Sequence, residues 1–244
     1  MLEQFEKYVS GYSLDQGYMK LKREHSMRVM ELMGKYAKLL NYSGDDVELA
    51  KLIGLLHDIG RFEQYKVFGN DIDHKTVDHA DYSVAQLFDK NEISVFTDRE
   101  EWYPIIKFAI KNHNKLEIPK CDDERVLRFA KLIRDIDKLD IIYLMGYLKL
   151  NMYKDAPEDI TDEVKEYIFN HKTVDIKKCK NDNDWTTTQF AFVFDINNDV
   201  ILEEYKKNLD YYYQRINKER FKEIYEEIIK YIDERIDSYE RNRN

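Results

Sequence analysis

The chain has 244 residues and a net charge of −9, with 36% charged and 43% hydrophobic residues. The hydrophobic share, together with 19 Tyr and 12 Phe, is enough for a sizeable core and argues against disorder. The negative charge argues against binding to nucleic acid polymers or anionic lipid, and the lack of a signal peptide, a transmembrane stretch and a Cys-x-x-Cys pattern predicts a cytoplasmic protein.

The scarcity of helix breakers, with 3 Pro and 8 Gly, favours helices over sheet and predicts an all-α fold. A short helix is expected over residues 2–9. The next helix is clear from His25, which shares an apolar face with Val29 and Leu32, and it ends at about residue 41. A single histidine on such a face is more often a core residue than a ligand, so His25 needs partners to be informative.

Residues 45–56 form the third predicted helix, whose apolar stripe runs into His57 and Asp58 and is expected to stop at Gly60. Because this stripe points into the core, the His-Asp pair should be buried, and a buried carboxylate needs a cation or several hydrogen-bond donors. An isolated pair of this kind is more often a helix-terminal histidine with a capping aspartate. Residues 61–77 are polar and irregular and predict a loop.

Two more histidines fall on apolar helices. A helix starting near Asp78 is expected to carry His79, and a helix from about Glu100 should end at His113. The other two histidines lie in polar segments and are expected at the surface: His74 and His171.

The helix predicted from residue 124 to about residue 150 has acidic residues within its apolar stripe. Asp137 and Asp140 occupy positions where the helical period demands apolar side chains, whereas Asp135 falls on a charged face typical of the surface. Asp137 is therefore the better ligand candidate, although pairing with Arg134 is an alternative. Asp140 would orient a ligand or accept a proton, or would be a buried hydrogen-bonded carboxylate.

The sequence beyond residue 151 offers no catalytic pattern. We predict a catalytic domain over residues 1–150 and a helical extension over residues 151–244 that packs on it. The predicted elements of the extension are a short helix over 157–170, a polar loop or hairpin over 172–188, a helix from 185, with a strand as the alternative, and a long helix over 202–239. Its Tyr-rich segment 211–213 is expected to pack internally or to form a homodimer contact, rather than to stack on nucleobases.

Four residues, in order and spacing, resemble the His…His-Asp…Asp signature of the HD superfamily of metal-dependent phosphohydrolases: His25, His57, Asp58 and Asp137. Two more match the additional histidines of its two-metal branches: His79 and His113. The resemblance covers roughly residues 20–150 and implies a helical HD-domain bundle with a dinuclear metal site at its centre. It also implies that Asp58 bridges a first ion, held by His25, His57 and Asp137, and a second ion, held by His79 and His113.

Imidazole and carboxylate ligands without thiolates suit a catalytic site for two divalent ions, with Fe or Mn favoured over Zn, Ni, Co and Mg. A metal-activated hydroxide would attack a phosphate ester or anhydride, with Asp58 and Asp140 as the catalytic residues. Four cations near the ligands are candidates for holding the substrate phosphate, although a structural or solvated role is the default for each: Arg61, Lys115, Arg134 and Lys138.

The predicted function is a phosphomonoesterase or phosphodiesterase acting on a nucleotide or another small phosphometabolite. Two alternatives stay open, namely a di-iron oxygenase that uses the same ligands and a non-catalytic ligand-sensing module. Some two-metal members that act on cyclic dinucleotides have paired histidines where this chain has His113-Asn114, and they carry a Gly-Tyr-Pro motif that is absent here. This departure argues against a cyclic-dinucleotide substrate.

Overall fold

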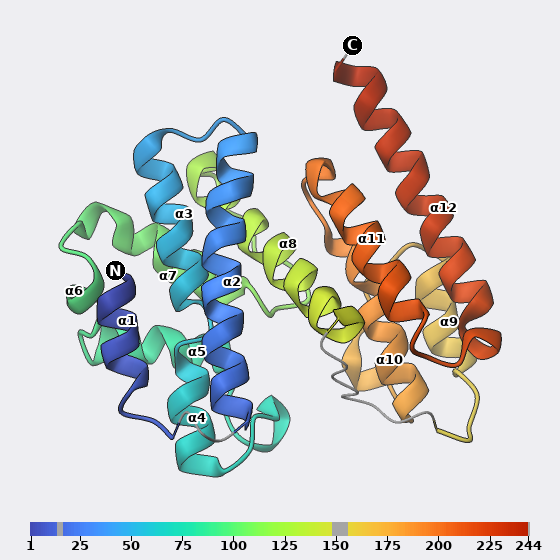
Figure 1. The fold of residues 1–244 in the computed structure, drawn as a ribbon, viewed down its shortest axis with the longest axis horizontal. Helices are drawn as coiled ribbons and strands as arrows, with labels where there is room; N and C mark the ends of the chain where they lie inside the picture. Colours follow the sequence, from blue (N-terminus) through green and yellow to red (C-terminus); the bar gives the residue numbers. More distant parts are fainter. Residues whose placement is uncertain (14–16, 148–155, 244) are drawn as a thin grey trace. The chain divides into compact units, whose positions relative to one another are not determined.

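The computed structural model describes residues 1–13, 17–147 and 156–243, and these residues form helices and no β-strand (Figure 1). The all-α prediction is therefore confirmed. The α-helices are α1 (Leu2–Val9), α2 (Gly17–Leu39), α3 (Gly44–Leu56), α4 (Gly60–Phe68), α5 (His79–Val84), α6 (Ile93–Phe96), α7 (Tyr103–Asn112), α8 (Glu124–Tyr147), α9 (Asp162–Phe169), α10 (Asp182–Phe190), α11 (Leu202–Tyr213) and α12 (Lys218–Arg243). None of the helices in the described ranges has the length and apolar character needed to cross a bilayer.

The chain divides into two compact units, Met1–Asp137 and Lys138–Asn244. The division falls within α8, so this helix contributes its first part to one unit and its last part to the other. The predicted boundary near residue 150 lies outside the described residues, and the predicted packing of a 151–244 extension on the first domain stays a prediction.

In the first unit, α2 packs along α3. Ser43 begins α3 by accepting a hydrogen bond from the backbone N–H of Asp46, as its position before the helix predicts. The two helices come very close at Gly54, where a Cβ atom would lie 2.8 Å from the Cγ of Met33. This close approach, one turn before the end of α3, brings the residues that follow α3 toward α2.

The structure overturns the first half of the loop predicted over residues 61–77: residues 61–68 belong to α4, while residues 69–77 are irregular apart from one 3₁₀ turn. Gly60 does not terminate a helix, because α3 already ends at Leu56 and Gly60 is the first residue of α4. The residue is needed for packing: a Cβ atom there would lie 2.5 Å from the backbone nitrogen of Ser83, whose Oγ accepts a hydrogen bond of 2.9 Å from the Gly60 N–H. A short 3₁₀ turn, Asp73–Lys75, lies in the same segment.

Replacing Gly60 with alanine is expected to destabilise the protein, because the new methyl group would force the backbone of α5 away. Overpacking of this kind costs about 1–3 kcal/mol of unfolding free energy, which denaturant unfolding would measure. Gly44→Ala is a matched control, since nothing lies within 4 Å of a Cβ at Gly44 and alanine is favoured in helices. Equal stability of the two variants would contradict the packing role of Gly60.

Two further helices of the first unit, α5 and α7, begin close to where their sequences predict, whereas α6 was not predicted. Asp78 caps α5 by accepting hydrogen bonds from the N–H groups of Ala80 and Asp81, and Pro104 is accommodated in the first turn of α7. In α8, the prediction that Asp135 lies at the surface is wrong, because its side chain is fully buried. The adjacent residues of α8 are buried as well, so this helix is covered on more than one face: Ile133, Arg134 and Ile136.

In the second unit, the helix predicted from residue 185 is confirmed as α10, which begins three residues earlier, while the single long C-terminal helix is not. The loop predicted over 172–188 extends only to Asn181, which caps α10 through its side chain, and no hairpin forms there. The predicted helix over 202–239 is two helices, α11 and α12, which pack on each other. The Tyr-rich segment is used in internal packing, since Tyr211 contacts Tyr147 and Tyr213 stacks on Tyr225 with ring centroids 4.4 Å and 3.8 Å apart, respectively.

Candidate metal centre

The four histidines of the apolar helices lie at the same point of the first unit, and all are buried. His25 projects from α2, His57 directly follows α3, His79 opens α5 and His113 directly follows α7. The C-terminal ends of α3 and α7 and the N-terminal end of α5 therefore meet at the position of His25 on α2. The two predicted aspartate ligands, Asp58 and Asp137, lie among them, so the structure brings all six predicted ligands together.

The first group of ligands surrounds one oxygen of Asp58. The Oδ2 atom of Asp58 lies 3.8 Å from Nε2 of His25 and 3.7 Å from Nε2 of His57. Asp137 completes this group, with its Oδ1 atom 3.2 Å and 3.6 Å from the same two nitrogens. Asp137 therefore points into the protein at the imidazoles, as its position in the apolar stripe predicts.

The second group surrounds the other oxygen of the same carboxylate. The Oδ1 atom of Asp58 lies 3.5 Å from Nε2 of His79 and 3.6 Å from Nε2 of His113. The two nitrogens are 3.0 Å apart. Asp58 thus presents each of its oxygens to a separate pair of histidines.

The ring protons of three histidines are fixed by their hydrogen bonds. The Nδ1 atoms of His57 and His113 lie 2.8 Å and 2.7 Å from the backbone carbonyls of Gly54 and Ile110. A carbonyl only accepts hydrogen bonds, so Nδ1 carries the proton and Nε2 presents a lone pair. Burial, followed by the charge of Arg61, lowers the pKa of His79 to about 4, which keeps this imidazole in the neutral form that binds metals.

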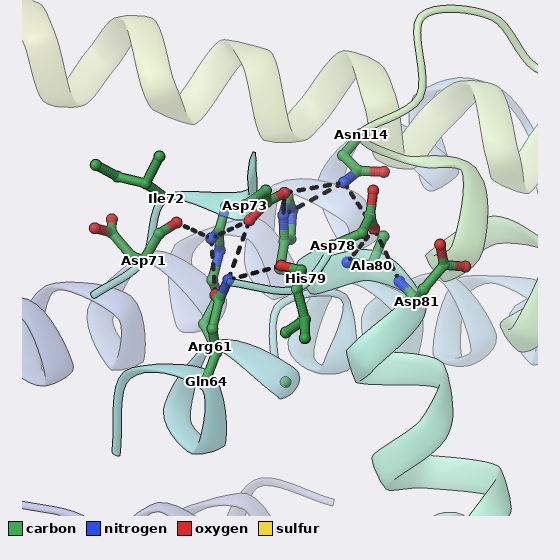
Figure 2. Close-up of polar contacts among 12 residues, drawn as sticks. Arg61, Gln64, Asp71, Ile72, Asp73, Asp78, His79, Ala80, Asp81 and Asn114 are labelled. Carbon is green, nitrogen blue, oxygen red and sulfur yellow. Dashed lines mark hydrogen bonds and ion pairs between the residues drawn. The ribbon is translucent and has the colours of Figure 1, made fainter. Parts of the chain in front are cut away.

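Asp73 orients His79 and was not predicted from the sequence. Its Oδ2 atom accepts a hydrogen bond from Nδ1 of His79 at 2.5 Å, while its Oδ1 atom accepts bonds from Arg61 and Gln64 (Figure 2). Figure 2 shows this carboxylate between the Arg61 and Gln64 side chains and the His79 imidazole. A carboxylate that holds the second nitrogen of a ligating histidine is a recurrent support of metal sites. Asp73 lies in the segment predicted as a loop, where no periodicity marks it.

Replacing Asp73 with asparagine is expected to weaken binding of one ion, the one held by His79, by about 10–100-fold. The amide cannot match the charge of the carboxylate, so the imidazole loses its strongest orienting contact. Metal titration by calorimetry would measure the change. Asp122→Asn is the control, because its side chain is 91% exposed; an unchanged affinity in Asp73→Asn would show that His79 needs no carboxylate.

The electrostatics of the site fit bound cations. Burial opposes ionisation of both ligand carboxylates, yet the Lys22 ammonium holds the pKa of Asp58 well below its usual range, and the hydrogen bond with His25 does the same for Asp137. The Oδ1 atom of Asp58 is buried without a hydrogen-bond partner in the described residues. The Nε2 lone pairs of His79 and His113 face each other at 3.0 Å, which is repulsive unless a cation lies between them. The six residues therefore fit divalent metal.

Three of the four predicted phosphate-binding cations are engaged elsewhere. Arg134 is buried and donates to backbone carbonyls at the end of α7 and just after it, at Asn112, Lys115 and Leu116, so it supports the segment that carries His113. Lys115 pairs with Asp78 and Asp81. The fourth cation, Arg61, has its Nε atom 3.9 Å from the Oδ1 atom of Asp58 and is the one of the four beside the metal ligands.

Two predicted site residues belong to the second unit. Lys138 forms an ion pair of 2.6 Å with Asp195 of that unit. Asp140 is buried and follows Asp137 by one turn of α8. Its catalytic role stays a prediction.

Sequence reasoning also missed Lys22, whose Nζ atom lies 2.7 Å from the Oδ2 atom of Asp58. The signal was present, because Lys22 precedes His25 by three residues and so projects from the same side of the helix. The apolar periodicity that identified this helix, however, was clear only from His25 onward, so Lys22 was not considered.

Comparison with known proteins gives a family match over the part of the chain that holds the candidate metal centre. The family model described as HD domain matches residues 23–142, a range that contains all six candidate ligands. No curated protein and no solved structure gives a significant match to the chain.

Proposed function

Residues 23–142 belong to the HD domain family of metal-dependent phosphohydrolases, and from this membership we propose that the protein hydrolyses a phosphate ester or anhydride of a small metabolite. HD domains bind divalent metals through clustered histidines and aspartates, and the clusters of this chain are of that type. We propose two ions, with Fe or Mn favoured, one at each oxygen of Asp58.

The observation that carries the proposal is the symmetry around the Asp58 carboxylate. Each of its oxygens faces a pair of histidines and has a cationic side chain beside it, Lys22 at Oδ2 and Arg61 at Oδ1. With two divalent ions bound, the positive charge of the ions, Lys22 and Arg61 would exceed the negative charge of the nearby carboxylates Asp58, Asp73 and Asp137. A phosphoryl group supplies the missing negative charge, whereas a neutral substrate does not.

The ions would stabilise the charge of the phosphoryl group and activate water for attack. The residues of the chain would position the metal ligands and contact the substrate. The hydrogen bonds at Nδ1 of His57, His79 and His113 hold the rings in place, and Arg61 is available to receive a substrate oxygen.

A small substrate fits the charge of the protein better than a polymer. The net charge of −9 repels a polyanion such as nucleic acid, while the local cations of the site attract a single phosphoryl group. We therefore propose a nucleotide or another small phosphorylated metabolite as the substrate.

A test combines elemental analysis of the purified protein with an activity screen. Protein loaded with Mn²⁺ or Fe²⁺ should hydrolyse at least one class among nucleotides, dinucleotides and sugar phosphates. The same protein after chelation should be inactive and should recover when the metal is restored. Absence of hydrolysis across the panel, together with oxygen uptake by the reduced iron form on a polyol or phosphonate, would contradict the proposal and indicate an oxygenase.

A further inference from the structure

Two side chains of α2 extend toward the metal ligands without serving as ligands themselves. Tyr18 and Lys22 precede His25 by seven and three residues, so all three share one face of the helix. The same face that delivers His25 to the metal centre therefore delivers a hydroxyl and an ammonium group. Neither was singled out by the sequence, because the predicted helix began at His25.

Lys22 is directed at the shared ligand carboxylate. Its Nζ atom lies 2.7 Å from the Oδ2 atom of Asp58, and its side chain is only 20% exposed. An ammonium group has three N–H donors, and this contact uses one of them. The others are available to an oxygen that approaches Asp58 from the side of His25 and His57.

Arg61 approaches the same carboxylate at its other oxygen. Its Nη1 group is fixed by Gln64, by Asp73 and by the backbone carbonyl of Asp71 (Figure 2). Its Nε atom is buried, lies 3.9 Å from the Oδ1 atom of Asp58 and has no hydrogen-bond partner in the part of the chain that the structure describes. A buried N–H without an acceptor is costly, and an anionic ligand would satisfy it.

Tyr18 supplies a third unsatisfied donor. Its ring stacks on Tyr65 with a centroid distance of 4.5 Å, and its hydroxyl is buried with no hydrogen-bond partner among residues 1–13, 17–147 and 156–243. Tyr65 follows Arg61 by four residues on the same face of α4, so this stack places Tyr18 on the Arg61 side of the site. Burial raises the pKa of Tyr18 well above its usual value, so the group is a neutral donor.

We propose that Lys22 Nζ, Arg61 Nε and Tyr18 Oη form an oxyanion clamp that receives the nonbridging oxygens of the substrate phosphoryl group beside Asp58. The clamp rests on the proposed phosphohydrolase function and extends it to the residues that select the substrate. Two cations and a neutral hydroxyl suit a phosphoryl group, and the stacked Tyr18 ring fixes the hydroxyl in position.

The test is binding of inorganic phosphate to the metal-loaded full-length protein, measured by calorimetry with Mn²⁺ and checked by elemental analysis. Lys22→Met should weaken phosphate binding by about 10–100-fold, as expected for loss of a charge-assisted hydrogen bond. Tyr18→Phe removes only the hydroxyl, keeps the ring stack and should weaken binding by about 3–10-fold. Both variants should keep the metal content of the unmodified protein. Lys20→Met is the matched control, because Lys20 is on the same helix with a side chain 67% exposed, and it should bind phosphate unchanged.

Unchanged phosphate affinity in both variants, in a protein that still hydrolyses phosphate esters, would overturn the clamp and leave the proposed function standing. Loss of metal in Lys22→Met with full phosphate affinity in Tyr18→Phe would also overturn it, because Lys22 would then act through the metal ligands. If the unmodified, metal-loaded protein neither binds phosphate nor hydrolyses any ester, the clamp and the proposed function both fail.

Discussion

Replacing Asp58 with asparagine is expected to remove both metal ions and to lower phosphohydrolase activity on the order of 10³-fold or more. Asp58 is the one residue whose two oxygens face the two histidine pairs, so its loss affects both ions at once. Two metal ions contribute several kcal/mol of transition-state stabilisation, and each 1.36 kcal/mol corresponds to about tenfold in rate. Elemental analysis and initial rates with the best substrate of the panel would measure the two effects.

Asparagine has nearly the same size as aspartate, so the helices around Asp58 should remain folded. Circular dichroism of Asp58→Asn should match that of the unmodified protein, which separates loss of metal from loss of fold. Retention of both ions in Asp58→Asn would show that the carboxylate does not bridge them. Retention of one ion would show that its other ligands hold it without the Asp58 carboxylate.

Asp137→Asn is expected to remove the ion held by His25 and His57 while the other ion stays bound. The Oδ1 atom of Asp137 lies 3.2 Å and 3.6 Å from the first histidine pair, so the ion at His79 and His113 should stay bound and one equivalent of metal should remain. Hydrolysis that needs both ions should fall by about 10²–10³-fold, the range seen when one electrostatic contact to the transition state is lost. Metal content and rate should be measured on the same sample.

Asp135→Asn is the matched comparison, because the two aspartates are neighbours on one helix. Asp135 is fully buried, so its replacement should lower the unfolding free energy by about 1–3 kcal/mol while both ions remain. The expected pattern is therefore metal loss without unfolding in one variant, and lower stability without metal loss in the other. The reverse pattern would mean that Asp135 is the ligand.

The metal ligands were predictable because their chemistry conflicts with the helical period. Asp137 places a carboxylate within an apolar helix face, where its burial is unfavourable unless a cation or hydrogen-bond donors inside the core compensate it. The same reasoning failed for Asp135, because period alone assumes that a helix has one buried face. Helix α8 is buried on more than one side, and that depends on tertiary packing that the sequence pattern does not show.

The supporting residues were less predictable, for two physical reasons. Gly60 suggested a helix stop, yet it is required for close packing against Ser83, and the residues after it form α4 instead of a loop. Asp73 then falls in a segment without periodicity, where only its contact with His79 reveals its role. The predicted phosphate cations were chosen by distance along the chain, and salt bridges and carbonyl contacts within the fold engage Lys115, Lys138 and Arg134.

The hydrogen bonds from Nδ1 of His57 and His113 to carbonyls three residues earlier also affect which metal ion the site selects. Each imidazole is anchored to the end of its own helix, so the coordination sphere gains its shape as the polypeptide folds and has little freedom to adapt. A stiff sphere favours ions whose preferred bond lengths and angles match it, even where their intrinsic affinities follow a different order. Competition between Mn²⁺, Fe²⁺ and Zn²⁺ should therefore be governed by geometric fit as well as by ligand softness.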